Sequence, residues 1–159
     1  METTLDLVQT TSEDPDFQRL VGELDAELAH RDGEEHVFYH QYNGIAGLNR
    51  AVVVYLDGQA AGCGALKAFG RDALEIKRMY TRPSLRGRGV AWQVLRSLEQ
   101  WAARDGFARC VLETGRRQPE AIALYEKSGY SRIANFGPYA GVANSLCFEK
   151  RLDGRPPEK

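Results

Sequence analysis

Hydrophobic and polar positions in the first third of the chain predict one strand followed by one amphipathic helix. Between Thr4 and Gln9 the leucines alternate with polar residues, which is typical of a short strand. The segment Ser12–Pro15 offers a capping side chain, early acids and a first-turn proline, and apolar residues then recur every three or four positions to about His30. Residues 31–49 show no clear period, and we expect a second short helix and a loop there.

The rest of the chain shows further strand patterns and two more helical ones. Ala51–Leu56 and Gln59–Phe69 flank the pair Asp57-Gly58, which suits a tight hairpin turn because both residues tolerate a positive φ. Leu74–Thr81 predicts the next strand. The later elements are a helix from about Arg88 to Gly106, a strand at Ala108–Glu113, a helix from Pro119 to Gly129, and strands near Ser131–Ala134 and Ser145–Leu152. This order predicts an α/β fold in which helices flank a mixed, mostly antiparallel central sheet.

Length and composition narrow the class of protein. The 159 residues suit one domain, which we place at residues 1–152, with a polar and flexible tail at 153–159. A hydrophobic content of 43% with 27% charged residues excludes fibrous and broadly disordered chains. No apolar run approaches the ~20 residues that span a bilayer, and no basic start with an apolar run suggests secretion. We therefore expect a cytoplasmic protein that is not attached to a membrane.

Residue types that often bind metals give no metal-site pattern. The cysteines are odd in number and widely spaced, which favours three small buried side chains over a disulfide framework: Cys63, Cys110 and Cys147. The histidines, His30, His36 and His40, have no convincing set of partner ligands and are expected to be exposed, with their role left open. No bound metal is predicted.

Charge is distributed very unevenly along the chain. Residues 1–49 contain 11 acidic and 2 basic residues, whereas residues 71–96 contain 7 basic and 2 acidic ones. This contrast indicates that the middle of the chain meets an anion. Nucleic acid fits poorly, because the basic segment lacks interleaved aromatic residues and the rest of the chain would repel phosphates. A small phosphorylated ligand is the better candidate.

The turn Arg86–Ala91 is the sharpest local motif, since it connects a predicted strand to a predicted helix. Its glycines let a ligand approach the backbone, and the first amides of the helix can hold a phosphate or diphosphate. A purely structural tight turn is the alternative. Neither of two well-known phosphate-binding motifs fits: a P-loop needs Lys followed by Ser or Thr, and a dinucleotide-binding turn needs glycine where Trp92 stands.

Two segments resemble the GNAT family of N-acetyltransferases. Glu75–Ala91 is similar to the acetyl-CoA-binding segment of that family, whose pattern is [QR]xxGx[GA]. Gln118–Tyr130 is similar to the final acetyl-CoA-binding stretch, usually NxxAxxLYxxxGF, with Gln118 where the family often has Asn. The resemblance covers roughly residues 5–152 and is strongest from Val52 to Tyr130.

The resemblance implies a binding site for acetyl-CoA. The backbone of Met79, Tyr80 and Thr81 would pair with the pantetheine arm, and the amide of Met79 would face the developing oxyanion of the thioester. Gln118 would add a side-chain hydrogen bond. The diphosphate would be held by the amides of Arg86, Gly87, Arg88, Gly89, Val90 and Ala91, and the side chains of Arg86 and Arg88 could add charge-assisted contacts.

The resemblance implies catalytic roles for two residues. Glu75 stands where related enzymes place a general base, acting directly or through water, although a solvent-facing strand carboxylate is the alternative. Tyr125 stands where the family places the hydroxyl that protonates the CoA thiolate, although it could equally be a core residue. The implied reaction is direct attack of an amine on acetyl-CoA in a ternary complex.

The acceptor is the least defined part of the prediction. Tyr39, Arg78, Glu113 and Tyr139 are candidate substrate-binding residues, and aromatic walls with one cation suit a small primary amine or amino acid. A protein lysine or amino terminus is the first alternative. A non-catalytic module that binds or senses CoA is the second. A homodimer is expected because related domains often pair through their C-terminal strands.

Overall fold

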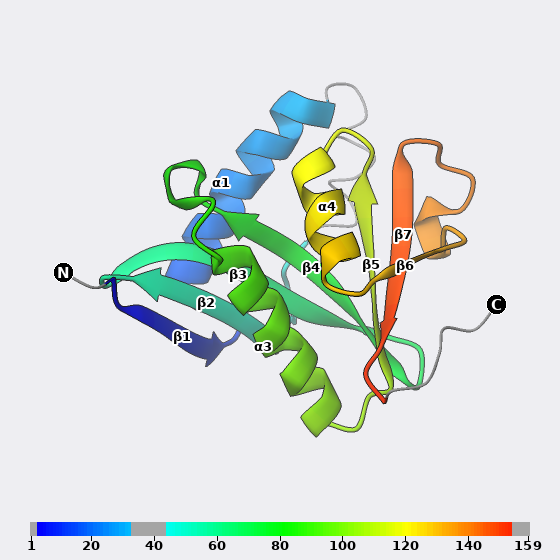
Figure 1. The fold of residues 1–159 in the computed structure, drawn as a ribbon, viewed down its shortest axis with the longest axis horizontal. Coiled ribbons are helices and arrows are strands. Elements are labelled where there is room, and N and C mark those ends of the chain that lie inside the picture. Colours follow the sequence, from blue (N-terminus) through cyan, green and yellow to red (C-terminus); the bar gives the residue numbers. More distant parts are fainter. Residues whose placement is uncertain (1–2, 33–43, 154–159) are drawn as a thin grey trace. The chain divides into compact units, whose positions relative to one another are not determined.

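A computed structural model describes residues 3–32 and 44–153 (Figure 1). The strands are hydrogen-bonded in the order β1-β2-β3-β4-β5-β7-β6. Their bounds are β1 (Leu5–Thr10), β2 (Arg50–Leu56), β3 (Gln59–Phe69), β4 (Ala73–Thr81), β5 (Arg109–Gly115), β6 (Ser131–Ile133) and β7 (Ser145–Arg151). The helices of the described residues are α1 (Pro15–Asp32), α3 (Val90–Arg104) and α4 (Pro119–Lys127), with 3-10 turns at Pro83–Leu85 and Gly137–Tyr139.

Strand directions confirm the predicted fold class. The strands β4 and β5 pair in parallel, whereas β1 with β2, β2 with β3, β5 with β7 and β6 with β7 pair antiparallel. The hairpin turn also forms as predicted, with φ values of 50° at Asp57 and 79° at Gly58. The fold is therefore a mixed, mostly antiparallel sheet with flanking helices.

Element bounds lie close to those that the hydrophobic pattern predicts, with two differences. The second short helix predicted within residues 31–49 involves residues 33–43, which lie outside the described ones. Strand β5 runs two residues beyond the predicted end, to Gly115, because β7 continues its ladder with Leu146 opposite Thr114 and Ser145 opposite Gly115. A pairing partner so distant in sequence leaves no mark on the strand's own pattern.

The chain packs into two compact units. Unit 1 contains residues 1–67 and 77–98, and unit 2 contains residues 68–76 and 99–159. Strands β3 and β4 and helix α3 each contribute residues to both units. The expectation of one domain over residues 1–152, followed by a tail, stays a prediction.

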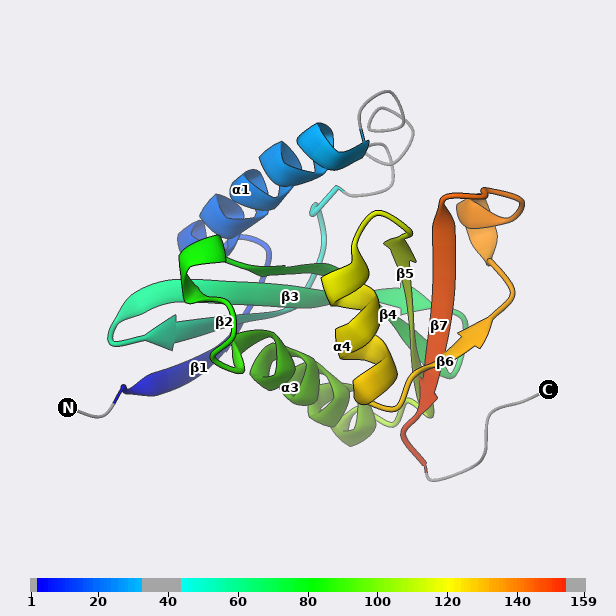
Figure 2. The same cartoon turned by 45° about the horizontal axis from the view of Figure 1, so that its top comes forward.

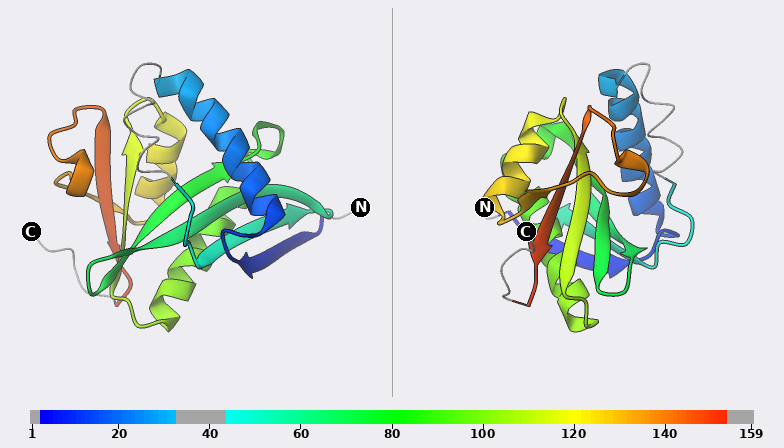
Figure 3. Two further views of the ribbon diagram at one scale, coloured as in Figure 1. Left: turned by 180° about the vertical axis from the view of Figure 1, so that it is seen from behind. Right: turned by 90° about the vertical axis from the view of Figure 1, so that its right-hand side faces the viewer.

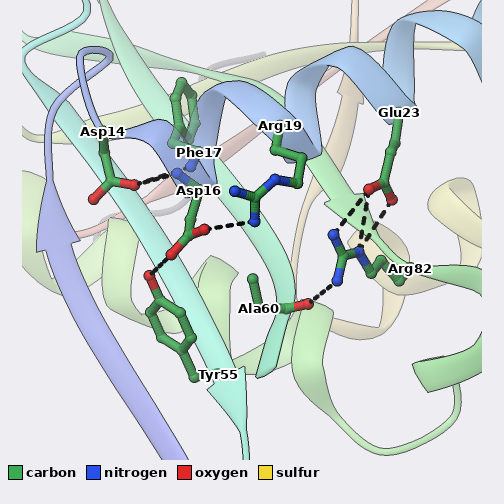
Figure 4. Close-up of polar contacts among 8 residues, drawn as sticks. All are labelled: Asp14, Asp16, Phe17, Arg19, Glu23, Tyr55, Ala60 and Arg82. Atoms are coloured by element: carbon green, nitrogen blue, oxygen red, sulfur yellow. Dashed lines mark hydrogen bonds and ion pairs between the residues drawn. The ribbon is translucent and has the colours of Figure 1, made fainter. Parts of the chain in front are cut away.

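In unit 1, helix α1 and the first half of α3 lie on opposite faces of the strands (Figures 1 and 3). The apolar residues of α1 are buried because they recur at helical spacing on the face toward the strands, and they join one core with alternate residues of β2 and β3. Its members include Phe17, Leu20, Val21, Leu24, Val53, Cys63 and Ala65. Asp14 caps the helix, since its Oδ1 accepts hydrogen bonds from the amides of Asp16 (2.8 Å) and Phe17 (3.0 Å) (Figure 4).

In unit 2, helix α4 packs on one face of β5 and β7 and the 3-10 turn Gly137–Tyr139 lies on the other (Figures 2 and 3). A buried polar network supports the α4 side. The carboxylate of Glu99 accepts hydrogen bonds from the Tyr130 hydroxyl at 2.8 Å and from the Lys150 ammonium at 3.0 Å. Because the buried carboxylate has a cation and a hydroxyl as partners, its negative charge is compensated.

Two glycines of β3 let α3 approach the strand closely. A Cβ on Gly62 would lie 2.8 Å from the carbonyl oxygen of Tyr80 and 2.6 Å from a methyl group of Val90. A Cβ on Gly64 would meet Val94 and Leu98 at 2.8 and 2.9 Å. The start of α3 can therefore be seated only if these positions carry no side chain.

We predict that Gly62→Ala lowers the free energy of unfolding by about 1–3 kcal/mol, because backbone at Tyr80 cannot give way to the added methyl group. The matched control is Gly22→Ala in α1, where nothing lies within 4 Å and the helix gains a better former, so stability should rise by about 0.5–1 kcal/mol. Urea unfolding of both variants measures the difference. Equal effects of the two changes would contradict the close packing of α3 on β3.

Candidate functional site

The turn that leads into α3 has the backbone geometry of an anion-binding loop. Gly87 and Gly89 both have a φ of +80°, and a Cβ on either would meet no atom within 4 Å. The amide of Arg86 donates to Pro83 (3.4 Å), and the helical hydrogen bonds begin with the amide of Gln93, which donates to Gly89 (3.0 Å). The intervening amides precede the first turn of bonds, so they are the ones that a phosphate could accept.

Strand β4 provides a backbone edge just before this turn. Its ladder with β5 covers only Ala73–Ile76, opposite Arg109–Leu112. Beyond it, Arg78 has a φ of +60°, a conformation that non-glycine residues rarely adopt. The three residues predicted to pair with pantetheine, Met79, Tyr80 and Thr81, directly follow this irregularity and belong to unit 1.

Tyr80 is fixed by α1 rather than free to move. Its hydroxyl donates to the Glu23 carboxylate at 3.2 Å, and its side chain is buried. Burial and the negative charge of Glu23 raise the pKa of Tyr80 to about 12. The residue therefore stays a neutral hydrogen-bond donor across the physiological pH range.

Three of the seven basic residues in segment 71–96 are paired with acidic residues of helix α1. Three ion pairs run from β4 and the turn after it to that helix: Arg78 with Asp25, Arg82 with Glu23, and Arg86 with Glu27. Figure 4 shows the second pair, in which Arg82 also donates to the carbonyl of Ala60 at 2.9 Å. The uneven charge distribution therefore reflects internal pairing to a large extent. Among the described residues, Arg88 is an exposed cation of the turn with no ion pair.

Unit 2 contains the two residues with expected catalytic roles, on opposite faces of its strands. Glu75 is buried in β4, on the same face as Glu113 and Cys147, as the ladder register and strand alternation show. Burial, together with the negative charges of Glu113 and Glu75, raises the pKa of the Cys147 thiol to about 11. Tyr125 packs on the other face, with its ring 6.3 Å from that of Phe148.

Tyr125 lies in an apolar environment that favours the neutral phenol. The side chain is 5% exposed and makes an edge contact with the Tyr130 ring at 5.8 Å. Burial, aided by the negative charge of Glu113, raises the pKa of Tyr125 well above its usual value. Gln118 lies immediately before α4, and its backbone amide donates to the carbonyl of Gly115 at 3.1 Å. The structure thus places Gln118 at the amino end of the helix that carries Tyr125.

The candidate acceptor-binding residues have different surroundings. Tyr39 lies outside the described residues. Arg78 is buried, and its guanidinium pairs with Asp25 and donates to the carbonyl of Val21 at 3.3 Å, so it faces α1. Glu113 is half-buried in β5, on the same strand face as Glu75 but two residues beyond Val111, the ladder partner of Glu75. Tyr139 is buried in that turn, 5.9 Å from the Phe136 ring.

Asn135 was missed by the sequence analysis. Its side-chain Nδ2 donates to three carbonyls, those of Tyr139 (3.1 Å), Val142 (3.1 Å) and Ser145 (2.9 Å). One amide group therefore holds the whole loop that carries Tyr139. The available signal was an asparagine two residues before a Gly-Pro pair, since asparagine often bonds to nearby backbone in irregular loops.

The described residues contain neither a cluster of metal ligands nor a membrane-spanning helix. Within residues 3–32 and 44–153, no group of three or more His, Cys, Asp or Glu side chains is arranged to hold a metal ion. The three cysteines are free and buried, as expected. His30 is exposed at the end of α1, and His36 and His40 lie outside the described residues. No helix in the described part of the chain is long and apolar enough to span a membrane.

The fold and the turn define a class, that of acyl-CoA N-acyltransferases. A candidate acyl-CoA N-acyltransferase of Klebsiella pneumoniae superposes with a TM-score of 0.79 at 28% identity, covering 94% of this chain and 98% of that one. The profile of the acetyltransferase (GNAT) family matches residues 11–130. The chain therefore belongs to the GNAT family.

Relatives and more distant structures agree with this assignment. An IAA acetyltransferase of Azospirillum brasilense is 36% identical over 104 residues, 65% of this chain and 68% of that protein. YsnE of Bacillus subtilis, an uncharacterised N-acetyltransferase, is 38% identical over 96 residues, 59% of this chain and 64% of that one. The PaiA N-acetyltransferase of Thermoplasma acidophilum, solved with coenzyme A, shares the fold at 15% identity, with a TM-score of 0.65 and coverage of 93% and 99%.

We predict that Gly89→Ala raises the Kd for CoA by about tenfold, because an L-residue at this φ costs ~1–2 kcal/mol and shifts the turn. Gly58→Ala in the β2–β3 turn is the matched control, since its φ of +79° imposes the same strain and its surroundings are equally open. Isothermal titration with CoA compares the two. Equal affinities of both variants would argue for a purely structural turn.

Proposed function

We propose that this protein transfers the acetyl group of acetyl-CoA to a primary amine of a small molecule, by direct attack in a ternary complex. The observation that carries the proposal is the turn before α3: its two glycines have a φ of +80° and open space at their Cβ positions, and its amides precede the first helical hydrogen bond. Such a turn suits a diphosphate. Family membership makes the diphosphate of acetyl-CoA the expected ligand.

The donor would be held by backbone groups of unit 1. The amides of Gly87, Arg88, Gly89, Val90 and Ala91 would bind the diphosphate, and the exposed Arg88 side chain would add charge. The edge of β4 at Met79–Thr81 would pair with the amide groups of the pantetheine arm as an added strand does. The amide of Met79 would donate to the thioester oxygen, and Gln118 would contribute a side-chain hydrogen bond.

Catalysis requires one group that accepts a proton and one that donates a proton. Glu75 would accept the proton that the amine must lose, directly or through water, because a neutral amine is the nucleophile. Tyr125 would donate a proton to the departing thiolate, and its raised pKa keeps the phenol protonated for this role. The two groups lie on opposite faces of the unit 2 strands, so each can serve a different reactant.

A small amine is favoured as acceptor, with Tyr39, Glu113 and Tyr139 as candidate contacts. Glu113, on the same strand face as Glu75, would supply negative charge suited to an ammonium group before deprotonation. Arg78 was a candidate for binding a substrate carboxylate, but its side chain is held by Asp25, so that role would need the ion pair to break. A cytoplasmic setting, where thiols stay reduced, suits the three free cysteines. Homodimer formation remains a prediction, to be checked by gel filtration.

The first experiment is a thermal shift assay with acetyl-CoA, CoA and ATP. A ligand that binds only the folded protein raises the Tm, so a rise with both CoA species and not with ATP supports the donor site. Thiol release is then measured across an amine library, and labelled acetyl-CoA is incubated with lysate. Label in small molecules supports the proposal, and label in protein supports a lysine or amino-terminal acceptor. Binding without transfer would indicate a non-catalytic CoA-binding module, and no shift would remove the proposal.

We predict that Tyr125→Phe lowers kcat by about 100-fold, because the proton donor is lost, and changes the Kd for acetyl-CoA by less than about twofold. The matched control is Tyr130→Phe, which removes another buried hydroxyl of unit 2 and should affect stability rather than kcat. Since burial raises the pKa of Tyr125, the wild-type rate should show no loss from this residue below pH 10. An unchanged kcat in Tyr125→Phe would exclude it from proton transfer.

We predict that Glu75→Gln and Glu113→Gln change different kinetic constants, although the two residues lie on the same strand face. Loss of the base in Glu75→Gln should lower kcat by about 100-fold. Glu113→Gln should mainly raise KM for the amine, by about fivefold, since it removes a charged contact. Steady-state kinetics over pH 5–9 tests both, and a reversed pattern would exchange the two roles.

A further inference from the structure

The side chain of Arg86 is directed at helix α1. Its Nη2 donates to both oxygens of Glu27, at 3.1 and 2.9 Å, and its Nε donates to the carbonyl of Thr81 at 3.0 Å. The guanidinium also lies over the Tyr80 ring, 5.9 Å from the centroid. Arg86 therefore joins the end of β4, the turn before α3 and helix α1, all within unit 1.

Helix α1 forms ion pairs with the residue before and the residue after the 3-10 turn Pro83–Leu85. Glu23 and Glu27 are four residues apart and so share one helix face. Glu23 binds Arg82, and Glu27 binds Arg86, which are the two residues that flank the 3-10 turn Pro83–Leu85. The carboxylate of Glu27 is itself held from behind by Arg31 at 2.9 Å. These ion pairs connect the 3-10 turn to α1, and through Arg86 they reach the first residue of the glycine turn.

These contacts engage two of the three guanidinium nitrogens of Arg86, because Nε binds the Thr81 carbonyl and Nη2 binds the Glu27 carboxylate. A guanidinium that keeps both contacts stays directed at α1 and has only Nη1 left for another acceptor. A fixed set of amides, in contrast, binds an anion with less loss of conformational entropy than a mobile set does. The same contacts that occupy Arg86 therefore favour binding through the backbone of Gly87–Gly89.

We propose that Arg86 is a positioning residue: held by Glu27, it sets the turn Gly87–Gly89 for diphosphate binding, and its guanidinium does not contact the phosphates. Helix α1 thus contributes to donor affinity through Glu27, a residue that carries negative charge and would by itself repel the ligand. This inference rests on the proposed function, since the diphosphate is that of CoA.

The sign of one substitution tests the proposal. Removing the negative charge of Glu27 would by electrostatics alone strengthen binding of the anionic CoA. If Glu27 positions the turn, Glu27→Gln instead weakens binding, with a Kd about fivefold higher at low salt. The matched control is Arg19→Gln, which breaks the α1 ion pair of Arg19 with Asp16 and should leave the Kd within about twofold. An unchanged Kd in Glu27→Gln overturns the proposal, and a lower Kd would show that Glu27 competes with phosphate for Arg86.

A double-mutant cycle tests whether Glu27 acts through Arg86. In the background Arg86→Gln, the further change Glu27→Gln should have no additional weakening effect, because the contact is already lost. Additive weakening would overturn the proposed route. Circular dichroism and urea midpoints confirm that each variant is folded at the titration temperature. If the wild-type protein does not bind CoA, the proposed function itself fails, whereas wild-type binding with an unaffected Glu27→Gln removes this inference alone.

Discussion

Ion pairing between α1 and the arginines of β4 and its following turn is the interaction on which unit 1 most depends. Asp25 compensates the charge of Arg78, whose side chain is only 1% exposed. A buried charge that loses its partner costs about 3–5 kcal/mol, so this pair ties the helix to the strand. The neighbouring pairs with Arg82 and Arg86 are more exposed and contribute less to stability. They connect α1 to the two residues that flank the 3-10 turn Pro83–Leu85.

Strand β4 serves both units with different parts of its length. Its first four residues form the parallel ladder with β5 and bring Glu75 to the face that also carries Glu113. After the ladder ends, the positive φ at Arg78 precedes the backbone edge Met79–Thr81. One strand thus contributes a carboxylate to unit 2 and, to unit 1, a backbone segment beyond the end of the β5 ladder. In the proposed reaction the carboxylate would serve the acceptor amine, and the backbone segment would bind the pantetheine arm of the donor.

Tyr125 and Glu75 owe their suitability to different surroundings. The phenol of Tyr125 is packed among aromatic rings, and burial holds its proton in place. The carboxylate of Glu75 lies on the opposite strand face, where polar residues and the Asn135-supported loop gather. Strand alternation alone separates the two environments, since successive side chains of β5 and β7 point to opposite faces. The proposed acid and the proposed base therefore have different surroundings within one unit.

The sequence by itself determined the order and type of the described elements and the turn before α3, because hydrophobic periodicity, caps and glycine turns act over a few residues. It also indicated Glu75 and Tyr125 as candidates through family resemblance. Only the tertiary structure decided where the charges go. Arg86 resembles a phosphate ligand in the sequence, yet it pairs with Glu27, 59 residues earlier. Charge is a property of single residues, whereas the distance between charges is set by the packing of α1 against β4.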